Sequence, residues 1–355
     1  MNTYKVIVLE GDGIGPEIIK ETVKVLNCIA QKYKFIINYE YELIGAASIK
    51  KTNEALQDTV VDKCKKADAI LLGAVGDLYY DNNPNLKIRP EQGLLKLRKH
   101  LNLFSNIRPV KAYKQIYKLS PLKEEIISDV DFIVYRELIG GIYFGEKGRE
   151  NQDSAYDICS YEKSQITKIA HQAFKEASNR RNMLTLVDKA NVLETSRLWR
   201  ETVIEISKEY PQVKLNCMFV DNMAMQIITN PKQFDVIITE NMFGDIITDE
   251  ASVITGSLGM LPSASIGETI AMFEPIHGSY PQAAGKNIAN PMAAFLSGAQ
   301  LLRYFNEEKA AKEIECCVEK ALELNYVTKD INTDNFIGTN QIADCLINLI
   351  NSNKN

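Results

Sequence analysis

The order of elements along this chain is clearest around residues 240–249, which read ENMFGDIITD. An apolar run from Phe234 to Thr239 precedes this stretch and apolar residues at helical spacing follow it, which predicts a strand, a tight turn and a helix. Asp245 and Asp249 are four residues apart, so a helix places both carboxylates on one face. Hard oxygen ligands of this kind suit Mg²⁺ or Mn²⁺ better than zinc, although acids in early helical turns also complement the helix dipole.

Length and composition restrict the class of protein. The 355 residues exceed one ordinary core, so two domains are expected. A hydrophobic content of 45% with 25% charged residues is typical of a globular protein, and no apolar run approaches the ~20 residues that a bilayer requires. The net charge of -5 offers no general attraction for nucleic acid or anionic membrane. We therefore expect neither as a partner.

The N-terminus and the cysteines favour a cytoplasmic location. Residues 1–6, MNTYKV, enter a strand at once and lack the layout of a signal peptide. The seven cysteines form no CxxC pair, which is typical of reduced thiols. With only three histidines, a His-rich metal site is not expected.

Strands and helices alternate in the first part of the chain, which predicts a largely parallel α/β sheet. A strand over Val6–Leu9 runs into a glycine cluster at 11–15. The third glycine of this cluster falls one position too early for the dinucleotide-binding Rossmann fingerprint. We expect a strand, a helix, a strand and a polar loop over 35–43, 53–65, 69–73 and 76–90.

The middle of the chain repeats one arrangement, a charged residue just after an apolar strand. Lys189, Asp221 and Asp245 each occupy this position. Because open α/β sheets bind ligands at the carboxyl ends of their strands, the repeated arrangement favours the metal-site interpretation of the first stretch. A long amphipathic helix is expected over 163–180.

Motifs along essentially the whole chain resemble the β-decarboxylating dehydrogenases of 2-hydroxy acids, and within them those that act on 3-isopropylmalate. Together these motifs are far more specific than any one of them. The matching stretches, in family order, are EGDGIGPE (10–17), LGAVG (72–76), RPEQGLLKLR (89–98), NIRP (106–109), RELIGGIYFG (136–145), VDKANVL (187–193), NMFGDIITD (241–249) and EPIHGS (274–279) through NP (290–291).

The resemblance implies a two-domain α/β fold of the isopropylmalate/isocitrate dehydrogenase type, which is not a Rossmann fold. One domain is expected to combine residues 1–103 with 256–355, and residues 104–255 would form the second, with an interdomain active-site cleft. The family is dimeric with shared active sites, and a hairpin at about 145–161 would clasp the partner chain. We therefore expect a homodimer that acts on a small-molecule substrate.

The resemblance also implies a reaction, the NAD-dependent oxidative decarboxylation of 3-isopropylmalate to 4-methyl-2-oxopentanoate and CO₂ in leucine biosynthesis. Lys189 would take the hydroxyl proton and Tyr143 would protonate the enolate that decarboxylation leaves. Mg²⁺ or Mn²⁺ would lie between the substrate and the carboxylates of Asp221, Asp245 and Asp249. By family analogy, Asp221 and Lys189 come from the partner subunit.

Arginines are suited to a substrate with two carboxylates, because a guanidinium donates as a planar fork. The two leucines near Arg98 suit an isopropyl group. The residues expected to bind substrate are Glu91, Leu94, Leu95, Arg98, Arg108, Arg136 and Asp221. Those expected to bind the cofactor are Glu274, His277, Gly278, Ser279, Gln282 and Asn290.

The cofactor loop departs from the family pattern at two positions. Tyr280 and Gln282 stand where the family usually has Ala and Asp. In relatives that use NAD, the Asp accepts hydrogen bonds from the adenosine ribose and repels a 2′-phosphate, whereas relatives that use NADP have a lysine there. A neutral Gln282 does neither, so we expect NAD with a weakened preference over NADP.

Two alternatives remain open. Relatives that act on isocitrate carry small polar residues at the start of the helix that holds Glu91, Leu94 and Leu95, so a related substrate such as isocitrate, homoisocitrate or malate/tartrate is the first alternative. The second is a non-catalytic regulatory subunit of the same fold. Such a subunit is expected to have lost part of the acid–base and metal set, but Lys189, Tyr143 and the three aspartates are all present.

Overall fold

The computed structural model describes residues 1–83 and 85–352. Pro84, in the loop expected over 76–90, and residues 353–355, at the end of the first expected domain, lie outside the described residues. The chain divides into two compact units, Met1–Asn102 with Ser257–Asn355 (unit 1) and Leu103–Gly256 (unit 2). Each is described by itself.

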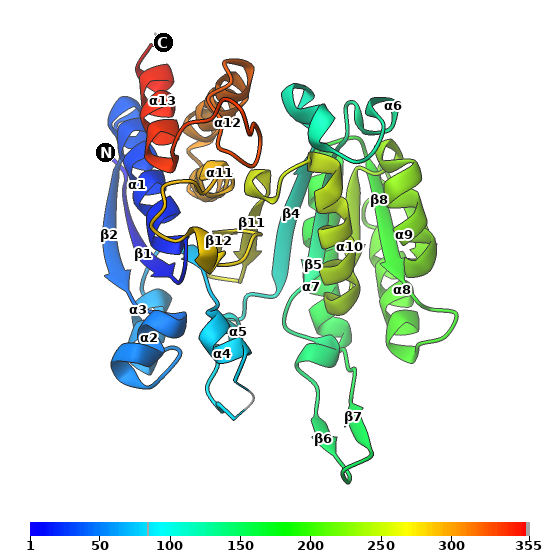
Figure 1. Cartoon of the computed structure of the whole chain (residues 1–355). Helices are drawn as coiled ribbons and strands as arrows, with labels where there is room; N and C mark the ends of the chain where they lie inside the picture. Colours follow the sequence, from blue (N-terminus) through cyan, green and yellow to red (C-terminus); the bar gives the residue numbers. More distant parts are fainter. Residues whose placement is uncertain (84, 353–355) are drawn as a thin grey trace. The chain divides into compact units, whose positions relative to one another are not determined.

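Unit 1 is built on five strands in the order β2–β1–β3–β12–β11, of which β2, β1, β12 and β11 are labelled in Figure 1. Neighbours run parallel from β2 to β12, and β11 runs antiparallel to β12. The strands are β1 (Thr3–Gly11), β2 (Ile36–Glu42), β3 (Ala69–Ala74), β11 (Pro262–Ile266) and β12 (Ala271–Pro275). The helices are α1 (Gly15–Tyr33), α2 (Gly45–Thr52), α3 (Asp58–Lys65), α4 (Leu78–Asp81), α5 (Glu91–His100), α11 (Met292–Tyr304), α12 (Glu308–Glu323) and α13 (Thr339–Ser352).

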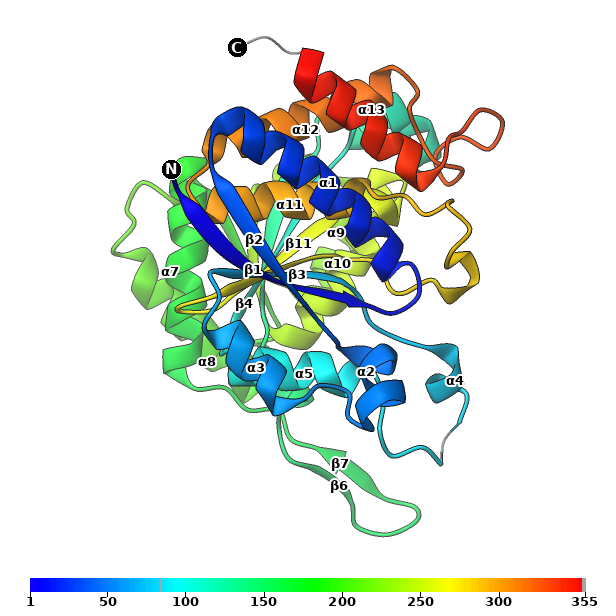
Figure 2. The same ribbon diagram turned by 90° about the vertical axis from the view of Figure 1, so that its left-hand side faces the viewer.

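The core of unit 1 lies between its strands and two central helices. The apolar stripe of α1, which includes Ile18, Ile19 and Leu26, is buried. Helix α11 is buried along nearly its whole length and packs on β11 and β12. Helices α1, α11, α12 and α13 lie side by side, as Figure 2 shows.

The prediction of a single helix over 53–65 is wrong in one respect. The structure has two short helices, α2 and α3, and only α3 falls within that range. Asn53 takes up a left-handed backbone conformation (φ 60°) and ends α2, because asparagine tolerates this conformation better than most residues. The polar loop expected over 76–90 likewise contains the short helix α4, whose start is capped by the side chain of Asp77.

The main sheet of unit 2 has five strands in the order β4–β5–β10–β8–β9. Strand β4 runs antiparallel to β5, and the other neighbours run parallel. The strands are β4 (Ser105–Lys111), β5 (Asp131–Glu137), β8 (Met183–Asp188), β9 (Lys214–Phe219) and β10 (Val236–Thr239). The helices are α6 (Glu124–Ile127), α7 (Lys163–Asn179), α8 (Glu194–Ser207), α9 (Val220–Thr229) and α10 (Asn241–Thr255). Helix α7 confirms the amphipathic helix expected over 163–180.

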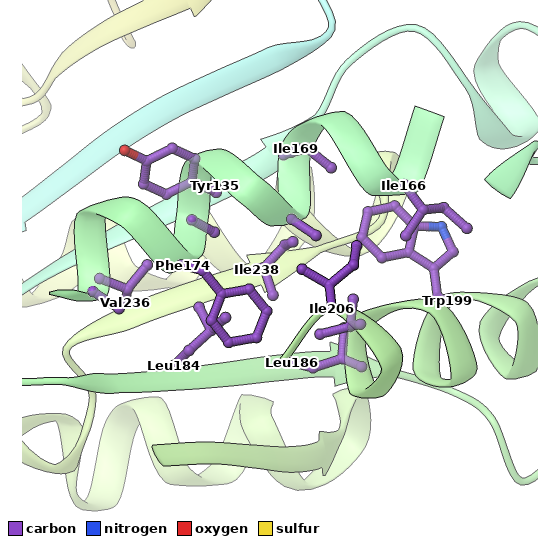
Figure 3. Packing of buried hydrophobic residues seen from close by; sticks show 14 of the residues in the cluster. Tyr135, Ile166, Ile169, Phe174, Leu184, Leu186, Trp199, Ile206, Val236 and Ile238 are labelled. Carbon is purple, nitrogen blue, oxygen red and sulfur yellow. The ribbon is translucent and has the colours of Figure 1, made fainter. Parts of the chain in front are cut away.

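Alternating side chains of the central strands supply two cores, one on each face of the unit 2 sheet. Val236 and Ile238 of β10 face a cluster with α7 and α8, in which Trp199 is fully buried (Figure 3). Ile237, between them, faces a cluster with α9 and α10. The two units together confirm the expected α/β class.

A separate antiparallel pair, β6 (Lys147–Arg149) and β7 (Ala155–Asp157), forms a hairpin that extends away from the rest of unit 2 (Figure 1). Across the described residues, no helix has the length and apolar character needed to cross a membrane.

Candidate active site

The stretch at 240–249 forms the expected strand, turn and helix. Strand β10 is fully buried and ends at Thr239, and α10 begins at Asn241. Arg108 faces both acids of this helix, with its Nη2 3.7 Å from Asp245 Oδ1 and its Nη1 3.9 Å from Asp249 Oδ1. Both carboxylates therefore lie on one face of α10, as the spacing predicts. The Asp249 side chain is 73% exposed and the Asp245 side chain is 36% exposed, so both remain accessible to a ligand.

Three further predicted residues gather around Asp245. Arg136, at the end of β5, forms a close ion pair with Asp245 Oδ1, and the hydroxyl of Tyr143 donates to Asp245 Oδ2 at 3.0 Å. The Arg136 guanidinium also lies 5.9 Å from the centre of the Tyr143 ring. Arg108 comes from β4, next to β5 in the sheet. Unit 2 therefore brings two arginines, one phenol and two carboxylates into one cluster.

Asparagine and threonine side chains orient the two arginines. Asn241 accepts from Arg136 Nε at its backbone and side-chain oxygens (3.0 and 3.1 Å) and from Nη2 at 2.8 Å. Asn106 accepts from Arg108 Nε at 2.6 Å, and Thr248 accepts from its Nη1. Sequence reasoning missed these three residues. Their only signal was a place inside the matched motifs, since nothing in their spacing pointed to an arginine partner.

The state of Tyr143 suits a proton donor. Burial raises the pKa of its phenol, and the neighbouring Asp245 carboxylate raises it further. The phenol is therefore protonated at neutral pH and donates its hydrogen to Asp245.

Lys189 and Asp221 form a second group in unit 2. Lys189 follows β8, and Asp221 lies in the first turn of α9, just after β9. Lys189 Nζ lies 2.7 Å from Asp221 Oδ1, and this hydrogen bond lowers the pKa of the Asp221 carboxyl. Among residues 1–83 and 85–352, no three His, Cys, Asp or Glu side chains are gathered as a metal-binding group. Asp221 of the same chain therefore does not join Asp245 and Asp249.

In unit 1, two residues that the sequence assigned separately to substrate and cofactor form an ion pair. Arg98, near the end of α5, places its Nη2 3.0 Å from Glu274 Oε1 on β12, and both side chains are largely buried. Leu97 anchors α5 in the core. On the same helix Leu94 is half-buried, whereas Leu95 and Glu91 are exposed, so these side chains are not consumed by core packing.

The loop predicted to bind the cofactor rests on the first glycine cluster. The carbonyl of Ser279 accepts from Ile14 N at 2.8 Å. A Cβ atom at Gly13 would lie 2.0 Å from that carbonyl oxygen, so only glycine allows the approach. The cluster that fails the Rossmann fingerprint therefore has a different use, which is to seat the 277–279 turn.

His277 stands neutral in this turn. Burial lowers the pKa of its imidazole, and its Nδ1 lies 3.0 Å from the carbonyl oxygen of Gly278. Its Nε2 is buried without a hydrogen-bond partner in the described part of the chain. A buried polar atom without a partner is the kind of group that a bound ligand can satisfy.

The side chain of Asn290 already forms hydrogen bonds within the protein, whereas that of Gln282 is exposed. Gln282 is exposed on a single 3₁₀ turn, Pro281–Ala283, and follows Tyr280, which is exposed and has a left-handed backbone (φ 38°). Asn290 is buried, where it accepts from Met292 N at 3.0 Å and donates to Asp330 Oδ2 at 3.1 Å. Asn290 therefore holds the start of α11, a structural role that the sequence did not indicate.

Comparisons with known proteins identify the family of the chain. The family model described as Isocitrate/isopropylmalate dehydrogenase matches residues 5–346. A 3-isopropylmalate dehydrogenase of Clostridium acetobutylicum is 50% identical over 355 residues, which covers 98% of this chain and 99% of the relative. One of Bacteroides fragilis is 48% identical over 349 residues, with 98% and 99% covered.

Solved structures give the same result at lower identity. Isocitrate dehydrogenase from Methylococcus capsulatus has a TM-score of 0.88 at 32% identity, covering 98% of this chain and 99% of that one. A β-decarboxylating dehydrogenase from Thermococcus kodakarensis has a TM-score of 0.81 at 31% identity, covering 98% and 96%. The chain therefore belongs to the isocitrate/isopropylmalate dehydrogenase family.

Proposed function

We propose that this protein catalyses the NAD-dependent oxidative decarboxylation of 3-isopropylmalate to 4-methyl-2-oxopentanoate and CO₂, a step of leucine biosynthesis. The observation that carries the proposal is the cluster of Arg108, Arg136, Tyr143, Asp245 and Asp249. This cluster occurs in a chain that is 48–50% identical, over nearly its whole length, to relatives named 3-isopropylmalate dehydrogenase.

The donor set suits a divalent cation. Asp245 and Asp249 supply hard carboxylate oxygens on one helix face, and Asp221 from a second copy of the chain would complete the set. Mg²⁺ or Mn²⁺ prefers such oxygen ligands. When bound, the ion supplies positive charge that polarises the C2 oxygen of the substrate.

The arginines would bind and orient the substrate. Arg108 and Arg136 are held by Asn106 and Asn241 before any ligand arrives, so their forked donors are preorganised for a carboxylate. Arg98 of unit 1 is similarly held by Glu274. A lysine at these places would lack the second parallel hydrogen bond.

We assign the two proton transfers to Lys189 and Tyr143. Lys189 Nζ would accept the proton of the C2 hydroxyl. NAD, when bound, would supply the acceptor for the hydride of C2. Breaking the bond between C3 and the leaving carboxylate releases CO₂ and leaves an enolate. The phenol of Tyr143, whose raised pKa keeps it protonated, would then deliver its proton to C3.

Leu94 and Leu95 support an apolar substituent on the substrate, since neither is buried in the core. The nicotinamide cofactor would bind at the loop of Glu274, His277, Gly278, Ser279, Gln282 and Asn290. We propose NAD, because no cation stands at position 282 to neutralise a 2′-phosphate.

We further propose a homodimer with shared sites. Helices α9 and α10 pack on each other and expose Met225, Ile246 and Val253. Apolar side chains exposed on adjacent helices are typical of an interface. A second chain that delivers Lys189 and Asp221 to the Asp245 cluster would complete the set of ligands that one chain leaves divided.

A substrate panel tests the proposal. Purified protein with Mg²⁺ and NAD should form NADH fastest with 3-isopropylmalate, and much more slowly with isocitrate, homoisocitrate, malate or tartrate. A higher kcat/KM for one of those acids would replace the proposed substrate. No turnover with any of them would favour a non-catalytic regulatory subunit.

A further inference from the structure

A carboxylate that has no role in the proposed chemistry is buried between the strand and the helix of the metal stretch. Glu240 lies between β10 and α10 and is 4% exposed. Its side chain does not cap its own helix. Burial raises the pKa of this carboxyl to about 7, and the charges of Asp188 and Glu137 add to the effect. The cost of burial indicates that the carboxylate has a use elsewhere.

That use is a hydrogen-bonded connection to the turn of Lys189. Ser196, on α8, is completely buried, and its hydroxyl donates to Glu240 Oε1. The same hydroxyl oxygen accepts from the backbone N–H of Lys189 at 3.1 Å. One serine therefore joins the turn that presents Lys189 to the residue that immediately precedes α10.

Two further hydrogen bonds hold the start of α10. The phenol oxygen of Tyr161 accepts from Asn241 N at 2.9 Å, and the side chain of Asn241 donates to Gly140 O at 3.1 Å. Asn241 also carries Arg136, which pairs with Asp245. If the start of α10 moved, Arg136 and Asp245 would therefore move with it.

A carboxylate is a better acceptor for this connection than a neutral group. Hydrogen bonds to an ionised oxygen are shorter and roughly twice as strong as neutral ones. Within the described part of the chain no cationic side chain forms an ion pair with Glu240, since Arg200 is paired with Asp188. Glu240 therefore accepts its hydrogen bond from Ser196, whose oxygen accepts in turn from the backbone N–H of Lys189.

We propose that Glu240 is a positioning residue that acts through Ser196 to hold the Lys189 turn in register with the start of α10. The inference rests on the proposed function, in which Lys189 of each chain is delivered to the Asp245 cluster of the second chain. Within one chain, the connection fixes the Lys189 turn relative to α10. It adds Glu240 and Ser196 to the residues on which turnover depends.

A double-mutant cycle with 3-isopropylmalate tests the kinetic consequence. Glu240→Ala and Ser196→Ala should each lower kcat about tenfold, with the KM for substrate changed less than about twofold. The double variant should show no larger decrease in kcat than either single variant, because both substitutions remove the same connection. Glu240→Gln should lose less kcat than Glu240→Ala, since its amide oxygen still accepts from Ser196, although as a neutral and weaker acceptor.

The matched control is Ser297→Ala on α11, a buried serine whose hydroxyl bonds only within its own helix. This control should alter stability but not kcat. A merely structural role for Glu240 would give the same pattern as the control, a loss of stability with an unchanged kcat in the folded fraction. That result would overturn the inference.

Amide hydrogen exchange tests the connection independently of turnover. Glu240→Ala should accelerate exchange in residues 188–193 by about tenfold, because Glu240 reaches that turn through Ser196. Unchanged exchange there would overturn the inference even if the wild type were active. A wild type that is inactive on 3-isopropylmalate would contradict the proposed function. The exchange measurement would still decide whether Glu240 holds the Lys189 turn.

Discussion

Replacing Glu240 by Gln is expected to change how the stability of unit 2 depends on pH. Burial raises the pKa of Glu240 in the folded chain to about 7 from an ordinary value of 4.5. The folded state holds the proton of Glu240 more tightly than the unfolded state does. The contribution of Glu240 to stability is therefore greatest below pH 4.5 and is lost as the pH rises to about 7. At 1.36 kcal/mol per unit of pKa, the loss is about 3 kcal/mol above pH 7.

Glu240→Gln removes this loss because an amide does not ionise in this range. The variant should gain about 3 kcal/mol relative to wild type between pH 5 and pH 8. Glu137, whose pKa is also raised to about 7 by burial, remains in both proteins and provides a common background. The difference between the two proteins therefore reports Glu240 together with its coupling to Glu137.

Urea unfolding followed by tryptophan fluorescence is a suitable assay. Trp199 is the only tryptophan of the chain and is buried in the core of unit 2, against Tyr161. Its signal therefore reports the unit that contains Glu240. Parallel stability curves of wild type and Glu240→Gln across pH 5–8 would refute the assignment of a strongly raised pKa to Glu240.

Three further substitutions test the proposed site. Asp245→Asn should keep the fold but lose most turnover, because a neutral amide binds Mg²⁺ poorly; a near-normal rate at low Mg²⁺ would remove Asp245 from the metal site. Leu94→Ser should narrow the preference for 3-isopropylmalate over malate, since a buried branched alkyl group is worth about 1.5–3 kcal/mol, and an unchanged kcat/KM ratio would exclude Leu94 from the pocket. Gln282→Asp should tighten NAD binding by up to about tenfold and weaken NADP binding; a wild type that clearly favours NADP in a titration would contradict our interpretation of this loop.

Local spacing predicted the arrangement of the two aspartates in the candidate site. Asp245 and Asp249 share a helix face because of their separation by four residues. Arg108 and Arg136 could be selected from the sequence, but their convergence on Asp245 depends on the pairing of β4 with β5.

Residues that act through contacts between distant segments could not be predicted in the same way. Ser196 meets Glu240 across 44 positions, and Asn241 meets Arg136 across 105. Gly244 is a similar case, because a Cβ there would lie 2.7 Å from Arg136 Cγ. A single sequence shows the residue types at such positions but not which segments pack together.

The boundary errors have a local cause. Asn53 ended a helix by adopting a left-handed conformation, and asparagine gives only a weak signal of this in a sequence. The pairing of Arg98 with Glu274 was also missed, because α5 and β12 are far apart along the chain.

Product analysis tests the central claim most directly. The purified protein, incubated with 3-isopropylmalate, NAD and Mg²⁺, should form NADH, 4-methyl-2-oxopentanoate and CO₂ in equal amounts. Formation of all three should stop when the metal is chelated and should be largely lost in Lys189→Ala. NADH formed without CO₂, or no product at all from 3-isopropylmalate, would contradict the proposed function.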